Sequence, residues 1–272
     1  MPEPVYQLDH VSFAYENARP ALHDVTFDVL RGESLVLLGA NACGKSTLLS
    51  LLDGLEFPTS GTIRAFGEPL TEHSLGQPAF ARPFRQRVGM MFQNSEIQLF
   101  CGTVEEELAF APLQLRLPPD QVRGRVEDTL KLLEIENLRD RSPQTLSGGE
   151  KKRVALGGLL TASPRVLLLD EPTAGLDPRS QQWLLELLTN LRAAGLTLIT
   201  ASHDLELAPE IADQAIIMSE DHQIVRQGPV REVIEDLDLL LSVNLIHAHA
   251  HAHGAHRHFH PHLHGLYHEH EH

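Results

Sequence analysis

The sequence predicts an α/β fold in which a largely parallel sheet carries an inserted, mostly helical lobe. Three observations carry this prediction. Short apolar runs typical of strands alternate with stretches of helical spacing, which is the order that a parallel sheet requires. A glycine-rich motif over residues 39–47 directly follows one of these runs. Another apolar run ends in the acidic pair Asp170-Glu171, at the edge where such sheets collect ligands.

The first part of the chain is predicted to be rich in strands. Apolar and polar residues alternate over Val11–Tyr15 and Val25–Val29, which indicates half-buried strands. The mostly apolar run Ser34–Leu38 indicates a buried strand. Leucines at helical spacing from Leu48 to Leu52 then predict a helix that ends at Gly54.

The middle of the chain, about residues 95–163, is predicted to be the helical lobe. Thr103 and Glu106 have capping-box spacing ahead of an apolar stretch, and Ser147 and Glu150 have the same spacing. We therefore expect a helix to begin at each of these pairs.

The alternation of strands and helices resumes after residue 164. Val166–Leu169 and Leu196–Thr200 are predicted buried strands, and Gln181–Ala194 is a predicted helix between them that Gly195 closes. These elements are expected to complete the parallel sheet.

Composition excludes several classes of protein. The 272 residues hold 22 Lys and Arg against 37 Asp and Glu, a formal net charge of −15, which disfavours nucleic-acid binding as the main activity. Two cysteines exclude a disulfide scaffold and suit a reducing compartment. No apolar run is long enough to cross a bilayer, and the first residues lack the pattern of a signal peptide. We expect a soluble, cytoplasmic protein.

Residues 39–47 fit the phosphate-binding pattern G-x-x-x-x-G-K-[ST] between a predicted strand and a predicted helix. Backbone N–H groups of such a loop surround phosphates, and the helix N-terminus adds partial positive charge. Lys45 is placed to reach the β- and γ-phosphates, and the Ser46 hydroxyl to bind Mg²⁺. The whole loop is Gly39, Ala40, Asn41, Ala42, Cys43, Gly44, Lys45, Ser46 and Thr47.

The acidic pair Asp170-Glu171 supplies the second half of this predicted nucleotide site. Asp170 is expected to hold Mg²⁺ directly or through water, and Glu171 to act as general base on the attacking water. An acidic pair after a strand is commonly structural on its own. Together with the Lys45 loop it predicts a nucleotide site that uses Mg²⁺; the family resemblance below specifies ATP.

The segment Leu146-Ser147-Gly148-Gly149-Glu150 resembles the signature of the ABC ATPases, and the resemblance covers residues 5 to about 240. It implies an ABC ATPase cassette: a RecA-like, mostly parallel core, an N-terminal antiparallel β subdomain and an inserted α-helical subdomain. It also implies one domain over residues 1–240 and an ATPase activity coupled to transport.

Other positions match the family's motifs in the expected order. Tyr15 matches the aromatic residue that stacks on adenine, and Gln93 the glutamine near the γ-phosphate and Mg²⁺. Asp177 matches the D-loop aspartate, and His203 the switch histidine. Each also has a plainer interpretation: Tyr15 and His203 as core residues, and Gln93 as a polar surface residue.

The signature itself predicts a second anion site. Ser147, Gly148 and Gly149 begin a predicted helix, where small residues let the backbone approach phosphate closely. The resemblance adds Glu150 and Asp177 to this set. Because one chain carries one phosphate loop and one signature, a dimer with two composite sites is implied, more simply a homodimer than a heterodimer.

The phosphate loop departs from the family pattern at two positions. Ala42 stands where glycine is usual, so we expect a slightly adjusted loop backbone. Cys43 lies beside Lys45 and a helix N-terminus, which predicts a lowered thiol pKa. Alkylation of Cys43 is therefore expected to block nucleotide binding, with ATP protecting.

The residues after Gln93 resemble the ATPases of energy-coupling-factor (ECF) importers. Those proteins work at the cytoplasmic face of the membrane with a transmembrane coupling subunit and a substrate-capturing subunit, and import vitamins or Ni²⁺ and Co²⁺. Ile97, Leu99 and Phe100 are candidate contacts for the coupling subunit, or equally half-buried core.

Residues 241–272 are predicted to be a flexible, metal-binding tail. Of the 17 histidines, 12 lie here, alternating with other residues, and neutral imidazole suits Ni²⁺ and Co²⁺. A purification tag and an inert tail are the plainer alternatives. The twelve are His247, His249, His251, His253, His256, His258, His260, His262, His264, His268, His270 and His272.

We therefore predict the ATP-hydrolysing motor of an ECF-type ABC importer for Ni²⁺ or Co²⁺. A vitamin importer whose tail only buffers metal is the main alternative. A metal buffer without turnover is a second. A DNA-repair or ribosomal ABC protein is disfavoured, because 272 residues leave no room for a long coiled-coil insertion or a second cassette.

Overall fold

The computed structural model describes residues 3–16, 20–253 and 256–263 of the chain, and for 247–253 and 256–263 it describes the backbone alone. Its central feature is a six-stranded sheet in the order β10-β9-β3-β8-β7-β6. All neighbouring pairs are parallel except β10 with β9. The strands are β3 (Ser34–Gly39), β6 (Val88–Met91), β7 (Val166–Asp170), β8 (Thr197–Ser202), β9 (Gln214–Met218) and β10 (Ile224–Pro229).

A second, four-stranded antiparallel sheet has the order β2-β1-β4-β5. It confirms the antiparallel N-terminal part that the family resemblance implied. Two of its strands, β1 (Pro4–Ala14) and β2 (Pro20–Leu30), run well beyond the short segments predicted from alternation, and two, β4 (Ser60–Ala65) and β5 (Glu68–Pro69), were not predicted.

The helices packed against these sheets begin and end close to the predicted positions. α1 (Lys45–Leu52) is followed by Gly54 at φ 67°, and α7 (Pro178–Ala193) by Gly195 at φ 86°, so both glycines adopt the left-handed backbone that ends a helix. Five further helices were not predicted: α2 (Glu72–Leu75), α3 (Pro78–Arg87), α8 (Ala208–Ile211), α9 (Val230–Ile234) and α10 (Leu237–Ser242).

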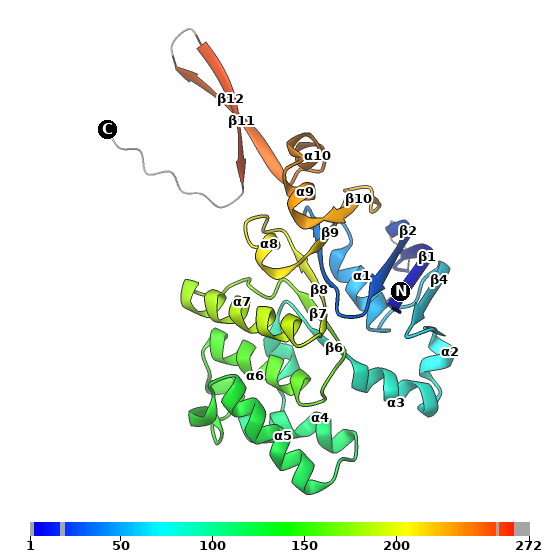
Figure 1. Ribbon diagram of the computed structural model, residues 1–272, viewed down its shortest axis with the longest axis vertical. Helices are drawn as coiled ribbons and strands as arrows, with labels where there is room; N and C mark the ends of the chain where they lie inside the picture. The colour runs from blue at the N-terminus through cyan, green and yellow to red at the C-terminus, as the bar shows by residue number, and fades with distance from the viewer. Residues whose placement is uncertain (1–2, 17–19, 254–255, 264–272) are drawn as a thin grey trace.

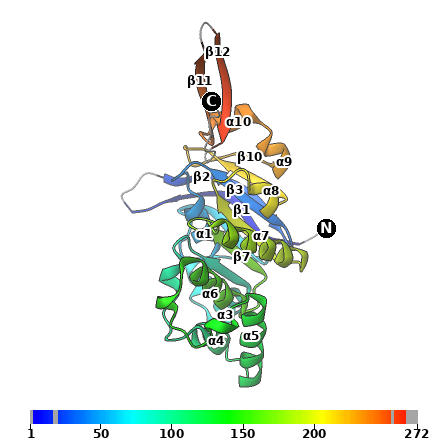
Figure 2. The same cartoon turned by 90° about the vertical axis from the view of Figure 1, so that its left-hand side faces the viewer.

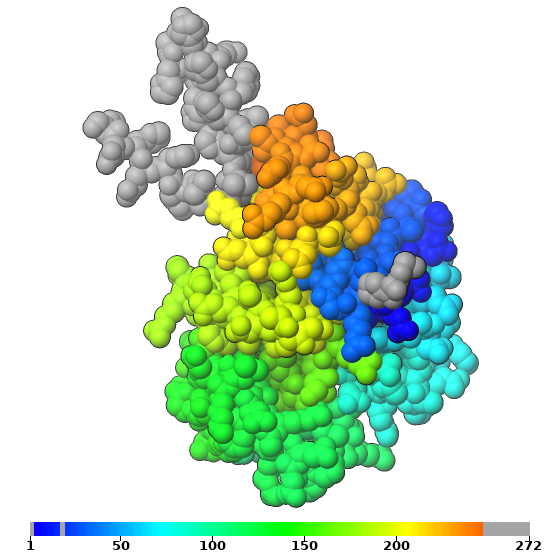
Figure 3. Space-filling model, viewed as in Figure 1, coloured from blue at the N-terminus to red at the C-terminus, as the bar shows by residue number. Residues whose placement is uncertain are grey.

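Every regular element between residues 95 and 163 is helical, and these elements gather at one end of the molecule (Figure 3). Both predicted capping boxes are present, because the Thr103 and Ser147 side chains accept from the backbone of Glu106 and Glu150, whose carboxylates bond back. The elements are η1 (Ser95–Gln98), α4 (Val104–Gln114), α5 (Pro119–Leu132), η2 (Glu136–Leu138), η3 (Pro143–Thr145) and α6 (Gly148–Leu160).

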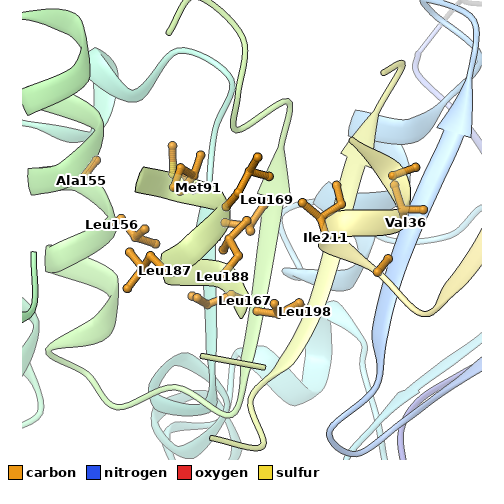
Figure 4. Close-up of a cluster of buried hydrophobic side chains, with 14 of the residues drawn as sticks. Val36, Met91, Ala155, Leu156, Leu167, Leu169, Leu187, Leu188, Leu198 and Ile211 are labelled. Carbon is orange, nitrogen blue, oxygen red and sulfur yellow. The ribbon is translucent and has the colours of Figure 1, made fainter. Parts of the chain in front are cut away.

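The parallel sheet separates two apolar clusters, because alternate residues of a strand face opposite sides. Leu167 and Leu169 of β7 face the cluster that includes α6 and α7 (Figure 4), whereas Leu168 faces the cluster with α1 and the antiparallel sheet. The first cluster extends along the chain as far as Ile246. Burial on both faces explains why the parallel strands are mostly apolar.

The C-terminal segment projects away from α10 as a hairpin (Figures 1 and 2). The sequence predicts a flexible tail, whereas the structure pairs β11 (Ile246–His253) with β12 (His256–Leu263) in antiparallel register. The period-two alternation of this segment is itself a strand pattern, which explains the difference. His264, His268, His270 and His272 lie outside the described residues.

Within the described ranges, no helix combines the length and the apolar character that crossing a bilayer requires.

Candidate nucleotide site

The predicted nucleotide-binding residues converge at one edge of the parallel sheet. β3, β7 and β8 end there at Gly39, Asp170 and Ser202, because parallel strands present their carboxyl ends together. They border a cleft of about 530 Å³. The cleft is lined by Tyr15, Ala21, Asn41, Ala42, Gly44, Lys45, Ser46, Thr47, Gln93, Glu171 and His203.

The phosphate loop depends on a glycine just before α1. Gly44 has φ 112°, and a Cβ there would lie 2.4 Å from the Ala21 carbonyl oxygen, so a larger residue does not fit. No side chain caps the N-terminus of α1, which leaves the N–H groups of its first turn available to an anion in the cleft.

Ala42 lies in the left-handed region at φ 64°, a conformation that glycine adopts more easily. The loop therefore keeps the backbone that a glycine would have, and the alanine bears a conformational cost of about 1 kcal/mol. This is the backbone constraint that the sequence predicted for this position.

Lys45 reaches back into its own loop. Its side chain is buried, and Nζ donates hydrogen bonds to the carbonyl oxygens of Gly39 at 2.6 Å and Ala40 at 3.1 Å. The ammonium is thus held at the centre of the loop, within reach of a phosphate that the loop surrounds.

The oxygen atoms around Asp170 fit a magnesium ion. Among the described residues, Asp170 Oδ1 is one of two buried side-chain atoms without a hydrogen-bond partner, so a buried acceptor remains available. Burial raises the pKa of Asp170, and the hydrogen bond from Ser46 opposes that shift. Hydroxyl, carboxylate and amide oxygens from Ser46, Asp170 and Gln93 are the ligand types that Mg²⁺ prefers.

Glu171 and His203 form a pair at the mouth of the cleft. His203 Nδ1 lies 2.9 Å from Glu171 Oε1, with the histidine side chain 53% and the glutamate side chain 10% exposed. Glu171 is held at φ 45°, and its N–H donates to the Ala201 carbonyl oxygen at 3.0 Å. A buried carboxylate that His203 holds at the lining of the cleft is arranged to receive a proton from water.

The plainer interpretations of Tyr15 and His203 as core residues do not match their positions, whereas Gln93 is a surface residue that also lines the cleft. Tyr15 is 45% exposed, and its hydroxyl lies 3.3 Å from Thr47 Oγ1, so it is not a core residue. His203 is likewise outside the core.

The prediction for Cys43 is wrong. Its thiol is buried, with 1% of the residue exposed, and burial raises its pKa although Lys45 pulls in the other direction. A Cβ on Gly39 would lie 2.5 Å from Cys43 Sγ, so this side chain packs tightly beneath the loop. The loss of hydration outweighs the nearby positive charge, and a reactive thiol that alkylation would reach is not present.

A second hollow, of about 670 Å³, lies at the signature and shares no residue with the cleft. Ser147, Gly148 and Gly149 line it at the N-terminus of α6, and Asp177 lines it at the N-terminus of α7. The structure therefore brings the predicted residues into two separate groups on one chain. Each helix N-terminus favours anions.

Two acidic residues of this hollow, Glu150 and Asp177, take part in the helix caps. Glu150 accepts from the N–H and the hydroxyl of Ser147 at 2.8 Å each, and these bonds lower the pKa of the Glu150 carboxyl. Asp177 accepts from the Arg179 and Ser180 backbones at 3.0 and 3.1 Å, and its pKa is lowered mainly by Ser180. The caps fix the positions of Ser147 and the neighbouring glycines.

Sequence reasoning found an apolar surface near the site only in part and missed a buried lysine. Of the predicted candidates, Leu99 is a core residue, whereas Ile97 and Phe100 are 68% and 62% exposed. Phe110 and Leu113 on α4 are exposed as well and were not predicted. Lys152 of α6 is buried against the loop that follows Glu171. Lys152 lies on the same face of α6 as the buried Leu156, because the two residues have helical spacing. This spacing is the feature of the sequence that indicates burial of Lys152.

Comparisons with known proteins agree with this geometry. Residues 22–174 match the family model described as ABC transporter. The chain is 48% identical to the nickel import ATP-binding protein NikO of Rhodobacter capsulatus, covering 89% of this chain and 96% of that one. It is 40% identical to the energy-coupling factor transporter ATP-binding protein EcfA of Methanocaldococcus jannaschii, covering 86% and 82%.

A solved structure is also similar. CbiO1 from Clostridium perfringens, described as part of the ABC transporter complex cbiONQ, superposes with a TM-score of 0.77 at 34% identity, covering 89% of this chain and 95% of that one.

Proposed function

Because this chain belongs to the ABC transporter family and is the ATP-hydrolysing subunit of such a transporter, we propose that it powers the uptake of Ni²⁺ or Co²⁺ through a membrane coupling subunit. The observation that carries the choice of cargo is the set of 12 histidines in residues 247–272, joined to a complete nucleotide site. The relative named for nickel import supports the same choice.

In the proposed reaction the loop of residues 39–47 binds the phosphates of ATP, with Lys45 on the β- and γ-phosphates. Ser46, Gln93 and Asp170 hold Mg²⁺, which neutralises charge on the phosphates when bound. Tyr15 stacks on adenine. The lining of the cleft, which includes Tyr15, Lys45, Ser46 and Gln93, supports these roles.

Glu171 is the proposed general base. Its carboxylate takes a proton from the water that attacks the γ-phosphate, and His203, 2.9 Å away, orients that carboxylate and contacts the phosphate side. The Ala201 oxygen of β8 accepts a hydrogen bond from the Glu171 N–H, and His203 directly follows Ser202 at the end of that strand. Glu171 and His203 therefore both stay near the edge of the sheet.

We propose that two copies of the chain form the active unit. The cleft at Lys45 and the hollow at Ser147 are separate on one chain, so each is completed by the opposite group of a second copy. ATP bound between them closes the dimer, and hydrolysis releases it, which gives the motor stroke.

The exposed apolar patch formed by Ile97, Phe100, Phe110 and Leu113 is the proposed docking surface for the coupling subunit at the cytoplasmic face of the membrane. The Phe100 and Phe110 rings pack edge to face at 4.8 Å, so the patch is a fixed surface. Ile97 and Phe100 closely follow Gln93 in the sequence, which ties docking to the nucleotide cleft.

The histidine hairpin is the proposed metal-binding element. Its backbone register pairs His247 with His262, and three further histidine pairs follow along the ladder. Neutral imidazoles bind Ni²⁺ and Co²⁺, so binding weakens as the pH falls through the histidine pKa near 6.5. The tail concentrates metal ions near the transporter.

A vitamin importer with a metal-buffering tail would share every feature of the nucleotide site. It would differ in the molecule that the substrate-capturing subunit binds, so cargo measurements separate the two. A metal buffer without turnover is disfavoured, because Lys45, Glu171 and His203 are all present at the cleft.

The test is accumulation of Ni²⁺ and Co²⁺ in cells that express the chain with its membrane subunits. Three versions are compared: the native chain, Glu171→Gln, and a chain ending at Ile246, the last residue buried in the core. We expect uptake of one of the two metals that Glu171→Gln abolishes. No Glu171-dependent uptake of either metal, with assembly of the complex verified, contradicts the proposal and favours the vitamin importer.

A further inference from the structure

The helix that begins at the signature sends one lysine into the protein interior. Lys152 lies one turn into α6, and only 8% of it is exposed. No carboxylate of the described residues lies within ion-pair distance of its ammonium. A buried, unpaired ammonium is costly unless hydrogen bonds compensate it, so its partners show what the site is for.

Those partners are two backbone carbonyl groups of one loop. Lys152 Nζ donates to the Pro172 oxygen at 2.7 Å and to the Ala174 oxygen at 2.6 Å. This loop leaves Glu171 and leads to Asp177 and α7. The lysine therefore joins the helix of one half-site to the loop that carries the proposed base of the other.

Without Lys152 the loop would lack partners for two of its acceptors. The Glu171 oxygen accepts from Ala174 N, and the Thr173 oxygen from Leu176 N, so these two are satisfied locally. Among the described hydrogen bonds, the Pro172 and Ala174 oxygens receive theirs from Lys152. Loss of both bonds leaves the loop free to rearrange.

The backbone at this point needs such support. Glu171 has φ 45° and Gly175 has φ 71°, so the bonded carbonyls lie between two left-handed residues. A glutamate in that conformation is strained and persists only when its surroundings hold it. Through its two hydrogen bonds, Lys152 holds the segment that directly follows the strained Glu171.

We propose that Lys152 is a positioning residue that holds the loop after Glu171 to the signature helix α6. The carboxylate of Glu171 is placed for catalysis only while this contact between the loop and the helix is made. The inference rests on the proposed role of Glu171 as general base. It assigns to Lys152 no contact with ATP, because its ammonium faces the loop carbonyls.

Steady-state ATP hydrolysis and ATP binding by the full chain test the proposal in Lys152→Met, Lys152→Arg and Lys131→Met. Methionine matches the length of lysine but donates no hydrogen bond, arginine donates, and Lys131 is an exposed lysine on α5. We expect Lys152→Met to lower kcat about tenfold to a hundredfold, as the loss of charged hydrogen bonds predicts, and to leave the ATP dissociation constant within about twofold. Lys152→Arg regains most of the rate, and Lys131→Met keeps it.

A double variant separates positioning from general damage. In the Glu171→Gln background, Lys152→Met is expected to cause no further loss in single-turnover hydrolysis, because the group that it positions is already gone. A further tenfold loss there, or a wild-type kcat in Lys152→Met, overturns the proposal. If the methionine variant does not fold, Lys152→Leu, which likewise donates no hydrogen bond, replaces it, and a wild-type rate in that variant also overturns the proposal. A wild-type rate in Glu171→Gln alone refutes the role of Glu171 instead.

Discussion

The two hollows that carry the nucleotide motifs are built in opposite ways. The cleft at Lys45 gathers buried charged groups and strained backbone, since Lys45, Asp170 and Glu171 are all buried and Ala42 and Glu171 have positive φ. The signature hollow has small residues at two helix ends, each held by a side-chain cap. In the proposed dimer, the cleft supplies the groups for hydrolysis and the signature hollow contacts the phosphate, so each region needs the other.

The largest expected effect separates the two regions by their chemistry. Glu171→Gln removes the proposed base while keeping the size of the side chain, so we expect a loss of about 10²–10⁴-fold in kcat with ATP binding retained. Radiolabelled ATP hydrolysis and equilibrium binding measure the two quantities. Hydrolysis at the wild-type rate contradicts the assignment.

A buried carboxyl at the end of α1, the helix that follows the phosphate loop, makes the stability of the protein depend on pH. Burial raises the pKa of Asp53 from 3.8 to about 7, against the pull of Arg85. Between these values the unfolded chain has lost a proton that the folded chain keeps, so stability falls as the pH rises and levels off above pH 7. The effect amounts to at most about 4 kcal/mol.

Urea unfolding from pH 4.5 to 8 measures this dependence. Asp53→Asn removes the titrating group and is expected to flatten the slope, whereas Asp120→Asn, on an exposed side chain, keeps it. Equal slopes in wild type and Asp53→Asn would show that Asp53 does not titrate in this range.

The two capping boxes allow the signature side to be tested against a structural twin. Ser147→Ala and Thr103→Ala each remove an N-cap with the same geometry, at a cost of about 1 kcal/mol in unfolding free energy. Only Ser147 is proposed to bond a phosphate, so its variant is expected to lose a further tenfold or more in ATP hydrolysis. Equal ATPase losses in the two variants would make Ser147 merely a cap.

The smallest expected effect concerns the phosphate loop backbone. Ala42→Gly relieves a left-handed alanine but adds freedom to the unfolded chain, so we expect a stabilisation of up to about 1 kcal/mol. Thermal unfolding measures it, with ATP affinity as the control. Destabilisation would show that the methyl group of Ala42 packs favourably enough to outweigh its backbone strain.

Patterns along the chain predict much of this architecture, and contacts across it explain the rest. Leu48–Leu52 and both capping boxes have strong local signals and were found. β6 (Val88–Met91) is four residues long and shows no alternation of apolar and polar residues. Most of β4 is exposed to solvent. Neither strand therefore has a local pattern that predicts it.

The site shows the same division. Lys45, Asp170 and Glu171 stand in motifs whose spacing alone predicts their convergence. Cys43 was misjudged because burial, which depends on distant residues, outweighs its charged neighbour. Lys152 was missed because its partners lie 20 residues further along the chain, which a sequence pattern does not link.

In the proposed dimer, the cleft at Lys45 of one copy is completed by the signature hollow at Ser147 of the other copy. Lys45→Met disables the cleft, Ser147→Arg disables the signature hollow, and each variant alone is expected to be inactive. Mixed dimers of the two contain one site in which both halves are intact, so their mixture is expected to regain about a quarter of the wild-type ATPase rate if subunits pair at random. A mixture that stays as inactive as either variant, with mixed dimers verified by differential tagging, contradicts the claim.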